Sequence, residues 1–117
     1  MEALGVEWVE ALVTASASAT EDQIGDRSGI IELTIGKKRR AVVSMIDGRV
    51  VGPSDAEGDD IDVSIPFTER QLKGYVSGDD SIAQAYVRGD VKPVGSSGPW
   101  LAFVELVESG ALATMAS

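Results

Sequence analysis

The chain has 117 residues, 44% of them hydrophobic, and a net charge of −9, so we expect one folded domain with little attraction for nucleic acid. It contains neither cysteine nor histidine, which excludes disulfides, thiolate nucleophiles, Cys/His zinc sites and Ser-His-Asp triads. Aromatic residues make up only 5% of the chain, so the core must consist mainly of aliphatic side chains.

The N-terminal half predicts one helix and a meander of three strands. Between Leu4 and Val13 the apolar residues recur at helical spacing, which predicts an amphipathic helix. Three later segments have the apolar and alternating patterns typical of strands. They cover residues 31–35, 41–46 and 49–51. Asp47-Gly48 is typical of a tight hairpin turn between the last two, because both residues tolerate positive φ.

The next segment predicts a strand followed by a capped helix. Residues 60–65 alternate between polar and apolar side chains, as a half-buried strand does. The segment Thr68-Glu69-Arg70-Gln71 has the form of a capping box, in which residues 68 and 71 each bond the backbone N–H of the other. Gly78 suits a left-handed residue that ends this helix.

The last third predicts two more helices with a strand between them. Asp79-Asp80-Ser81 predicts the start of a helix. Residues 91–94 predict a fifth strand, placed at a sheet edge or bulge because Pro93 has no N–H to donate. Gly98-Pro99 opens the final helix, which Gly110 ends.

This order of elements indicates a single α+β domain. Strands that come ahead of most helices favour a mostly antiparallel sheet with helices covering one face. Residues 1–117 show no repeat and no linker, and the tail over residues 111–117 is expected to fray. Residues 1–20 lack the basic start of a signal peptide, and no apolar run has the length of a transmembrane segment. We therefore expect a soluble, cytoplasmic protein.

Two clusters of charge have ordinary explanations beside functional ones. The basic run Lys37-Lys38-Arg39-Arg40 is either a solvated hairpin tip or a transient contact with an anionic membrane surface or headgroup. Carboxylates gather between Asp55 and Asp62, but a calcium loop starting at Asp55 needs glycine at 60 and glutamate at 66. Those positions hold Asp60 and Pro66, so we interpret the cluster as an acidic loop and expect no metal site.

No acid–base pair has a recognisable catalytic spacing, so we expect no catalytic residue, no cofactor and no enzymatic activity. Tyr75 and Tyr86 are interpreted as core residues with the hydroxyl at the rim. The apolar faces of the helices leave two interpretations open. Their side chains either fill a core or leave an apolar tunnel against the sheet, which would bind a ligand without any chemical motif.

Three segments together resemble a known family. They are the alternating strand Asp60–Ile65, the helix Leu72–Gly78, and Ala85–Gly95, which contains Arg88-Gly89-Asp90-Val91-Lys92. In this order they resemble the sterol carrier protein-2 (SCP2) family of lipid-binding domains, over about residues 3–110. The resemblance implies a five-stranded, mostly antiparallel sheet covered by helices around a hydrophobic tunnel.

The resemblance also implies a ligand class and site residues. Members bind sterols, fatty acids, acyl-CoA or other lipids, or serve as accessory domains. The tunnel-facing, ligand-binding positions carried over are Phe67, Leu72, Val76, Ile82, Tyr86, Phe103 and Val107. Arg88 and Lys92 either contact a ligand headgroup or lie at a solvated strand edge. The acidic composition and the ending Met115-Ala116-Ser117, unlike the peroxisomal address of the eukaryotic carriers, weigh against sterol and peroxisomes.

Our leading hypothesis is a small, non-catalytic protein that binds or carries a hydrophobic small molecule or lipid. One rival is an accessory or interaction module whose tunnel is filled by side chains, acting through a protein partner or as a homodimer joined by an apolar helix face. A second rival is an enzyme acting on a lipid-like or polyketide-like substrate. That rival would use a carboxylate or a tyrosine in the pocket, and a carboxyl group with a strongly raised pKa inside an apolar cavity would favour it.

Overall fold

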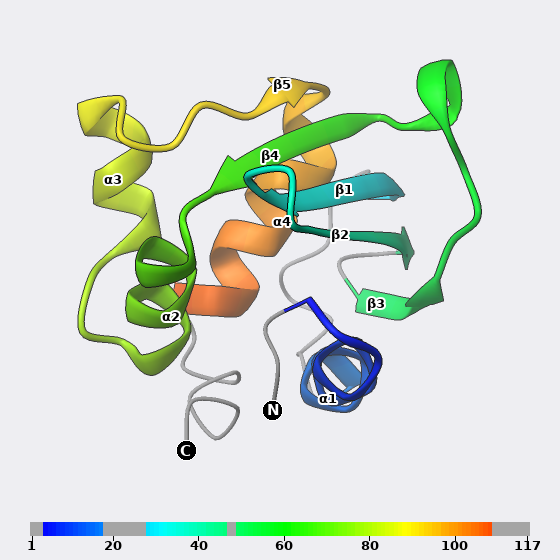
Figure 1. Cartoon of the computed structure of the whole chain (residues 1–117), viewed down its shortest axis with the longest axis horizontal. Coiled ribbons are helices and arrows are strands. Elements are labelled where there is room, and N and C mark those ends of the chain that lie inside the picture. The colour runs from blue at the N-terminus through cyan, green and yellow to red at the C-terminus, as the bar shows by residue number, and fades with distance from the viewer. Residues whose placement is uncertain (1–3, 18–27, 47–48, 109–117) are drawn as a thin grey trace.

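A computed structural model describes residues 4–17, 28–46 and 49–108 of the chain (Figure 1). Within these residues there are four α-helices, five strands and one 3-10 turn. The helices are α1 (Val6–Ala17), α2 (Glu69–Ser77), α3 (Ile82–Arg88) and α4 (Ser97–Glu108). The strands are β1 (Gly29–Ile35), β2 (Arg39–Ile46), β3 (Arg49–Pro53), β4 (Val63–Phe67) and β5 (Val94–Gly95), and the 3-10 turn is η2 (Gly58–Asp60). The expected Asp47-Gly48 turn, the helix end at Gly110 and the frayed tail lie outside the described residues.

The strands form one sheet in the order β3-β2-β1-β4-β5. Neighbouring strands are antiparallel except β1 and β4, which run parallel with Leu33 opposite Ile65. The parallel pair follows from the crossover through β2, β3 and the acidic loop, which returns the chain beside β1 in its original direction. The predicted α+β class and the mostly antiparallel sheet are confirmed.

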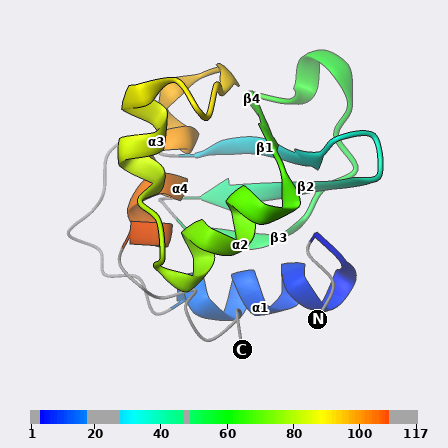
Figure 2. The same ribbon diagram turned by 60° about the vertical axis from the view of Figure 1, so that its left-hand side comes forward.

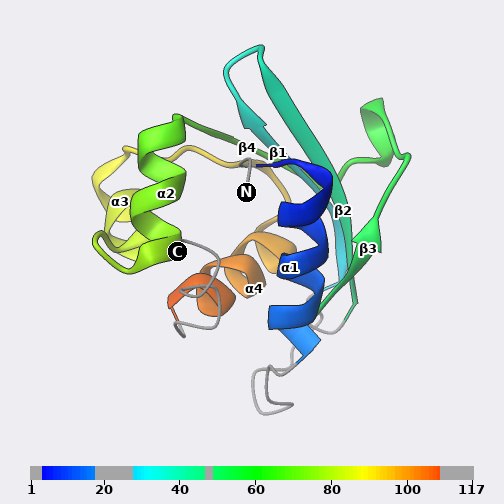
Figure 3. The same ribbon diagram turned by 60° about the horizontal axis from the view of Figure 1, so that its bottom comes forward.

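All four helices lie on one face of the sheet (Figure 3). Alternate side chains of the three central strands point to that face and are buried, among them Leu33, Val43 and Ile65. The residues between them face the other side, where Glu32 accepts hydrogen bonds from Arg40 Nε and from the Ser64 hydroxyl at 2.6 Å. This alternation is the physical reason that one sheet face forms the core.

Helix α2 begins and ends as the sequence predicts. The Thr68 hydroxyl accepts a hydrogen bond from Gln71 N at 3.1 Å, and Gln71 Oε1 accepts one from Thr68 N at 2.9 Å. Gly78 then takes a left-handed conformation with φ of 86°. Leu72, Tyr75 and Val76 form the buried side of the helix.

The segment Asp79-Asp80-Ser81 starts helix α3 as predicted, and the Ser81 hydroxyl supplies the capping oxygen, which accepts from Gln84 N at 3.2 Å. Two strands differ from their predicted bounds. Strand β4 covers Val63–Phe67 instead of residues 60–65, because Gly58–Asp60 form the 3-10 turn η2. Strand β5 contains only Val94–Gly95 instead of residues 91–94. Since Pro93 cannot donate to a ladder, pairing starts directly after it, at the edge of the sheet.

The buried side chain of Ser16 forms hydrogen bonds between helix α1 and the edge strand β3. The Ser16 hydroxyl accepts a hydrogen bond from Val50 N at 2.9 Å and lies 3.0 Å from Val50 O. Ser16 therefore gives β3 backbone contacts that an edge strand otherwise lacks. None of the helices in the described segments is long and apolar enough to cross a bilayer.

Candidate ligand-binding site

Six of the seven residues expected to face a tunnel are buried in the hydrophobic core. Their exposed fractions are 5% or less; they are Phe67, Leu72, Val76, Ile82, Phe103 and Val107. The seventh, Tyr86, is 43% exposed, with its ring against Trp100 of α4. The sequence therefore correctly predicted that these six side chains lie between the helices and the sheet. That they bind a ligand remains a prediction.

Five aromatic side chains run through this layer, and we call them the aromatic cluster. Tyr75 meets Phe67 with ring centroids 6.1 Å apart, and Phe67 meets Phe103 at 6.5 Å. Phe103 meets Trp100 at 6.4 Å, and Trp100 meets Tyr86 edge-on at 5.4 Å. The cluster thus extends from α2, through the end of β4, to the seam between α3 and α4. Figure 2 shows these three helices side by side.

A pocket of about 470 Å³ opens between the α2–α3 connection and the end of α4; we call it the α2–α4 pocket. Its buried lining consists of Tyr75, Val76 and Val107, two of which are expected tunnel residues. Its rim is polar and carries Asp80 and Glu108. This pocket connects the surface with the α2 end of the aromatic cluster, because Tyr75 belongs to both.

A larger, mainly apolar hollow of about 640 Å³ lies between α1 and strands β2 and β3; we call it the α1–β3 groove. Core residues Leu4, Val9 and Ala41 form its buried lining. Val6 and Val51, which are 78% and 53% exposed, contribute its outer apolar lining. Sequence reasoning missed this groove. The feature of the sequence that could have indicated it is Val6, an apolar residue of α1 that lies outside the apolar face packed on the core.

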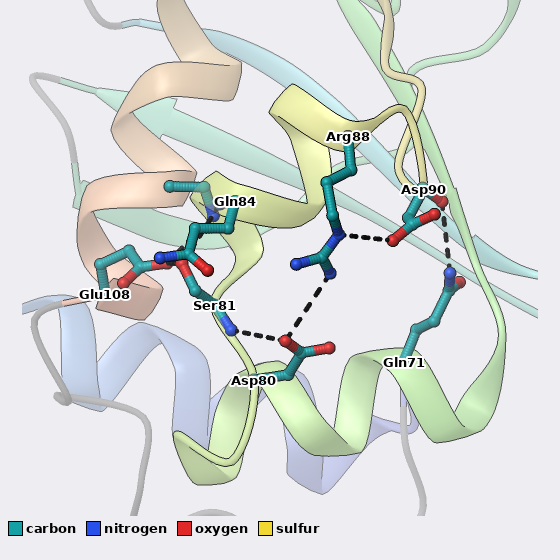
Figure 4. A network of polar contacts seen from close by, with 8 residues as sticks. Gln71, Asp80, Ser81, Gln84, Arg88, Asp90 and Glu108 are labelled. Atoms are coloured by element: carbon teal, nitrogen blue, oxygen red, sulfur yellow. Dashed lines mark hydrogen bonds and ion pairs between the residues drawn. The ribbon is translucent and has the colours of Figure 1, made fainter.

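The expected headgroup cations lie on the surface near α3. Figure 4 shows Arg88 between two carboxylates: its Nε is 3.0 Å from Asp90 Oδ2, and its Nη2 is 3.8 Å from Asp80 Oδ1. The hydrogen bond that Arg88 donates to Asp90 raises the pKa of Arg88 above its ordinary value. Lys92 is exposed. The charge of Arg88 is therefore already balanced by protein carboxylates.

The same network joins the three helices at their ends. Gln71 Nε2 donates to Asp90 O at 3.2 Å, which links the start of α2 to the end of α3. Glu108 Oε1 accepts from the Ser81 hydroxyl at 2.8 Å and from Ala83 N at 3.0 Å. These hydrogen bonds, with the Ala83 N–H as the largest cause, lower the pKa of Glu108.

The basic run and the acidic loop are both at the surface. Lys37 and Lys38 occupy the exposed turn between β1 and β2, as expected of a hairpin tip. Arg39 lies 3.4 Å from Glu69, and Arg40 contacts Glu32. Hydrogen bonds from the Ser64 hydroxyl, which is the largest cause, and from Arg40 lower the pKa of Glu32. Within residues 4–17, 28–46 and 49–108, no three acidic side chains are grouped in a way that could hold a metal ion.

Comparison with known proteins agrees with this architecture. No protein-family model matches the chain, and no curated protein matches its sequence. A crystal structure of sterol carrier protein 2 is similar with a TM-score of 0.64 and 16% identity, over 98% of this chain and 97% of that one. Palmitated SCP2L2 from Aedes aegypti has a TM-score of 0.62 and 12% identity, over 86% of this chain and 90% of that one.

A third similar structure is the UbiJ-SCP2 ubiquinone synthesis protein, with a TM-score of 0.60 and 12% identity, over 87% of this chain and 86% of that one. At such identities the likeness is one of fold. The chain has the fold of SCP2 domains, and the resemblance inferred from Asp60–Ile65, Leu72–Gly78 and Ala85–Gly95 is confirmed at that level.

Proposed function

We propose that this protein is a non-catalytic, cytoplasmic binding or carrier protein for a hydrophobic ligand. The observation that carries the proposal is the α1–β3 groove in an SCP2-like fold. Its volume of about 640 Å³ is typical of small-molecule sites, and its buried lining consists of core side chains. Binding there would be driven by apolar burial, at about 25 cal/mol per Å² before the costs of association.

Lipids are the first ligand class to test. The fold neighbour SCP2L2 from Aedes aegypti is described as palmitated, so a fatty acyl chain is one candidate. Acyl-CoA, sterols and related lipids are the others. The net charge of −9 works against the multiply anionic acyl-CoA through long-range repulsion.

The titration behaviour of the carboxyl groups supports a non-catalytic role. A general acid in an apolar site needs a raised pKa. In the part of the chain that the structure describes, the carboxyl groups with a shifted pKa, Glu32 and Glu108, are both shifted downward. Burial raises the pKa of Tyr75, which keeps its phenol protonated and unsuited to act as a base.

A second candidate is an accessory module that acts through a protein partner. The dense packing of Phe67, Phe103 and Trp100 favours it, because an interior already filled by side chains leaves little room for a ligand. One structure of this fold is named as a ubiquinone synthesis protein, so the fold is not limited to proteins that are named as carriers.

Native mass spectrometry of the purified protein, followed by organic extraction, tests the proposal. A co-purifying lipid near one equivalent would support it. An empty protein that also fails to bind Nile red, fatty acids and acyl-CoA would contradict it and favour the accessory module.

Three substitutions then locate the site. Val51→Trp places a large side chain in the α1–β3 groove, and Gln84→Trp places one at the α2–α4 pocket. Val87→Trp is the matched control, because Val87 is 84% exposed and lines neither cavity. We expect Val51→Trp to weaken Nile red binding about tenfold or more, with Val87→Trp unchanged. A loss limited to Gln84→Trp would move the site to the α2–α4 pocket.

A further inference from the structure

One buried donor in the helix layer has no protein partner. Among the described residues, Trp100 Nε1 is the buried side-chain polar atom without a hydrogen bond, although its side chain is only 1% exposed. Buried polar groups are almost always paired, since an unpaired one loses its hydration without compensation. An unpaired indole N–H inside a packed layer therefore needs an explanation.

The surroundings of Trp100 have the composition of a ligand site. Its ring lies between Tyr86 and Phe103, and the aromatic cluster continues from there to the α2–α4 pocket. Apolar and aromatic walls with a few well-placed polar groups are typical of small-molecule sites. Three of the residues expected from the sequence to bind ligand, Phe67, Tyr86 and Phe103, belong to the same cluster.

The aromatic cluster reaches the surface beside Trp100. Tyr86, at 43% exposed, is the member of the cluster on the surface, and its ring stands edge-on to Trp100. A hydrophobic molecule that displaces the Tyr86 ring would lie against the indole of Trp100.

We propose that Trp100 Nε1 donates a hydrogen bond to a neutral oxygen of the bound ligand, a hydroxyl, carbonyl or ether oxygen. The inference rests on the proposed binding of a hydrophobic ligand, but it locates that ligand at the seam between α3 and α4, because Trp100 lines neither the α1–β3 groove nor the α2–α4 pocket. It also narrows the ligand class. The preferred ligands are amphiphiles with a neutral polar end. Pure hydrocarbons are disfavoured because they leave the Trp100 N–H unpaired, and carboxylates are disfavoured as well.

Carboxylates are disfavoured because a buried anion needs a cation or several donors. One indole N–H supplies a single hydrogen bond. The guanidinium of Arg88, on the same helix as Tyr86, is held by Asp80 and Asp90. The positive charge of Arg88 is therefore already matched by protein carboxylates and offers little to a ligand carboxylate.

Indole NMR tests the inference on the unaltered protein. The chain has two tryptophans, so a ¹⁵N-labelled sample gives two indole N–H signals, and Trp8 in α1 serves as the internal control. Dodecane, 1-dodecanol and laurate supply the same chain length with no acceptor, a neutral acceptor and an anion. We expect 1-dodecanol to move the Trp100 indole proton downfield, dodecane to leave it nearly unchanged, and laurate to bind more weakly than the alcohol.

Trp100→Phe removes the donor and keeps an aromatic ring. We expect it to reduce the preference for 1-dodecanol over dodecane about tenfold, the effect of one hydrogen bond, while Trp8→Phe retains that preference. An unmoved Trp100 signal in the alcohol complex, or tightest binding by laurate, would overturn the inference and leave the carrier function intact. Failure of all three molecules to bind would overturn both.

Discussion

Ser16 shows how much one side chain contributes to this fold. It is fully buried, and its hydroxyl serves the N–H and C=O of Val50 on the edge strand β3. We expect Ser16→Ala to lower the free energy of unfolding by about 1–3 kcal/mol, because it leaves buried backbone groups unpaired. Thr14→Ala is the control, since that hydroxyl is exposed and bonds only Glu10 O. Urea unfolding measures both, and equal effects would contradict this role of Ser16.

Gly95 is required by a close approach of two strands. A Cβ added there would lie 2.1 Å from the carbonyl oxygen of Asp62, and its φ of +130° is one that other residues rarely adopt. We expect Gly95→Ala to cost about 3 kcal/mol, from backbone displacement and strain. Gly74→Ala is the matched control: its Cβ would make an ordinary contact at 3.7 Å with Asp80, and alanine favours a helix by about 1 kcal/mol. A tolerated Gly95→Ala in thermal unfolding would show that β5 can detach from β4 at no cost.

At the scale of elements, Glu108 joins the end of α4 to the start of α3. Its carboxylate accepts the Ala83 N–H and the Ser81 hydroxyl, and its pKa is lowered from the ordinary 4.5. A lowered folded-state pKa gives stability that is complete above the unfolded-state value. That stability is lost as the pH falls below 4.5 through the folded-state pKa.

We therefore expect Glu108→Gln to destabilise the protein by about 0.5–1 kcal/mol at pH 7, the usual contribution of a helix cap. The variant should also lose less stability than the wild type between pH 5 and about pH 3. Glu10→Gln, on the exposed side of α1, is the control for the removal of one surface carboxylate. Chemical unfolding at several pH values measures the difference, and parallel curves for Glu108→Gln and wild type would contradict it.

The elements that the sequence predicted well are those determined by neighbouring residues. The capping box at Thr68, the left-handed Gly78 and the alternating strands depend on positions a few residues apart, so a local pattern reveals them. The parallel pairing of β1 with β4 could not be read in the same way, because neither strand encodes its partner. The ion pairs of Arg88 likewise arise only when the α2–α3 connection brings Asp80 near.

The candidate site was predicted in part for the same reason. Apolar periodicity identified which side chains face inward, such as Leu72 and Phe103, but burial alone does not separate a lining residue from a filling one. The α1–β3 groove depends on the distance between a helix and an edge strand, which Ser16 and Val50 establish across 34 residues. Concavity of that kind appears only after the chain has folded.

At the scale of the whole molecule, electrostatics opposes folding. The net charge is −9, and the exposed acidic loop carries Asp55, Glu57, Asp59 and Asp60. The ion pairs of Arg88 and Arg39 are exposed, and such pairs contribute only about 0–1 kcal/mol each. Repulsion among the carboxylates therefore outweighs attraction when salt is low.

We expect the unfolding temperature to rise between about 0.01 M and 0.1 M NaCl, as the screening length falls from about 30 Å to about 10 Å. The double variant Asp55→Asn/Glu57→Gln removes two negative charges from the loop without touching the core, so it should be more stable at low salt and respond less to added salt. Thermal unfolding across the salt series measures both effects. A temperature that falls with salt would mean that surface pairs such as Arg88–Asp90 contribute more than the repulsion that they partly offset.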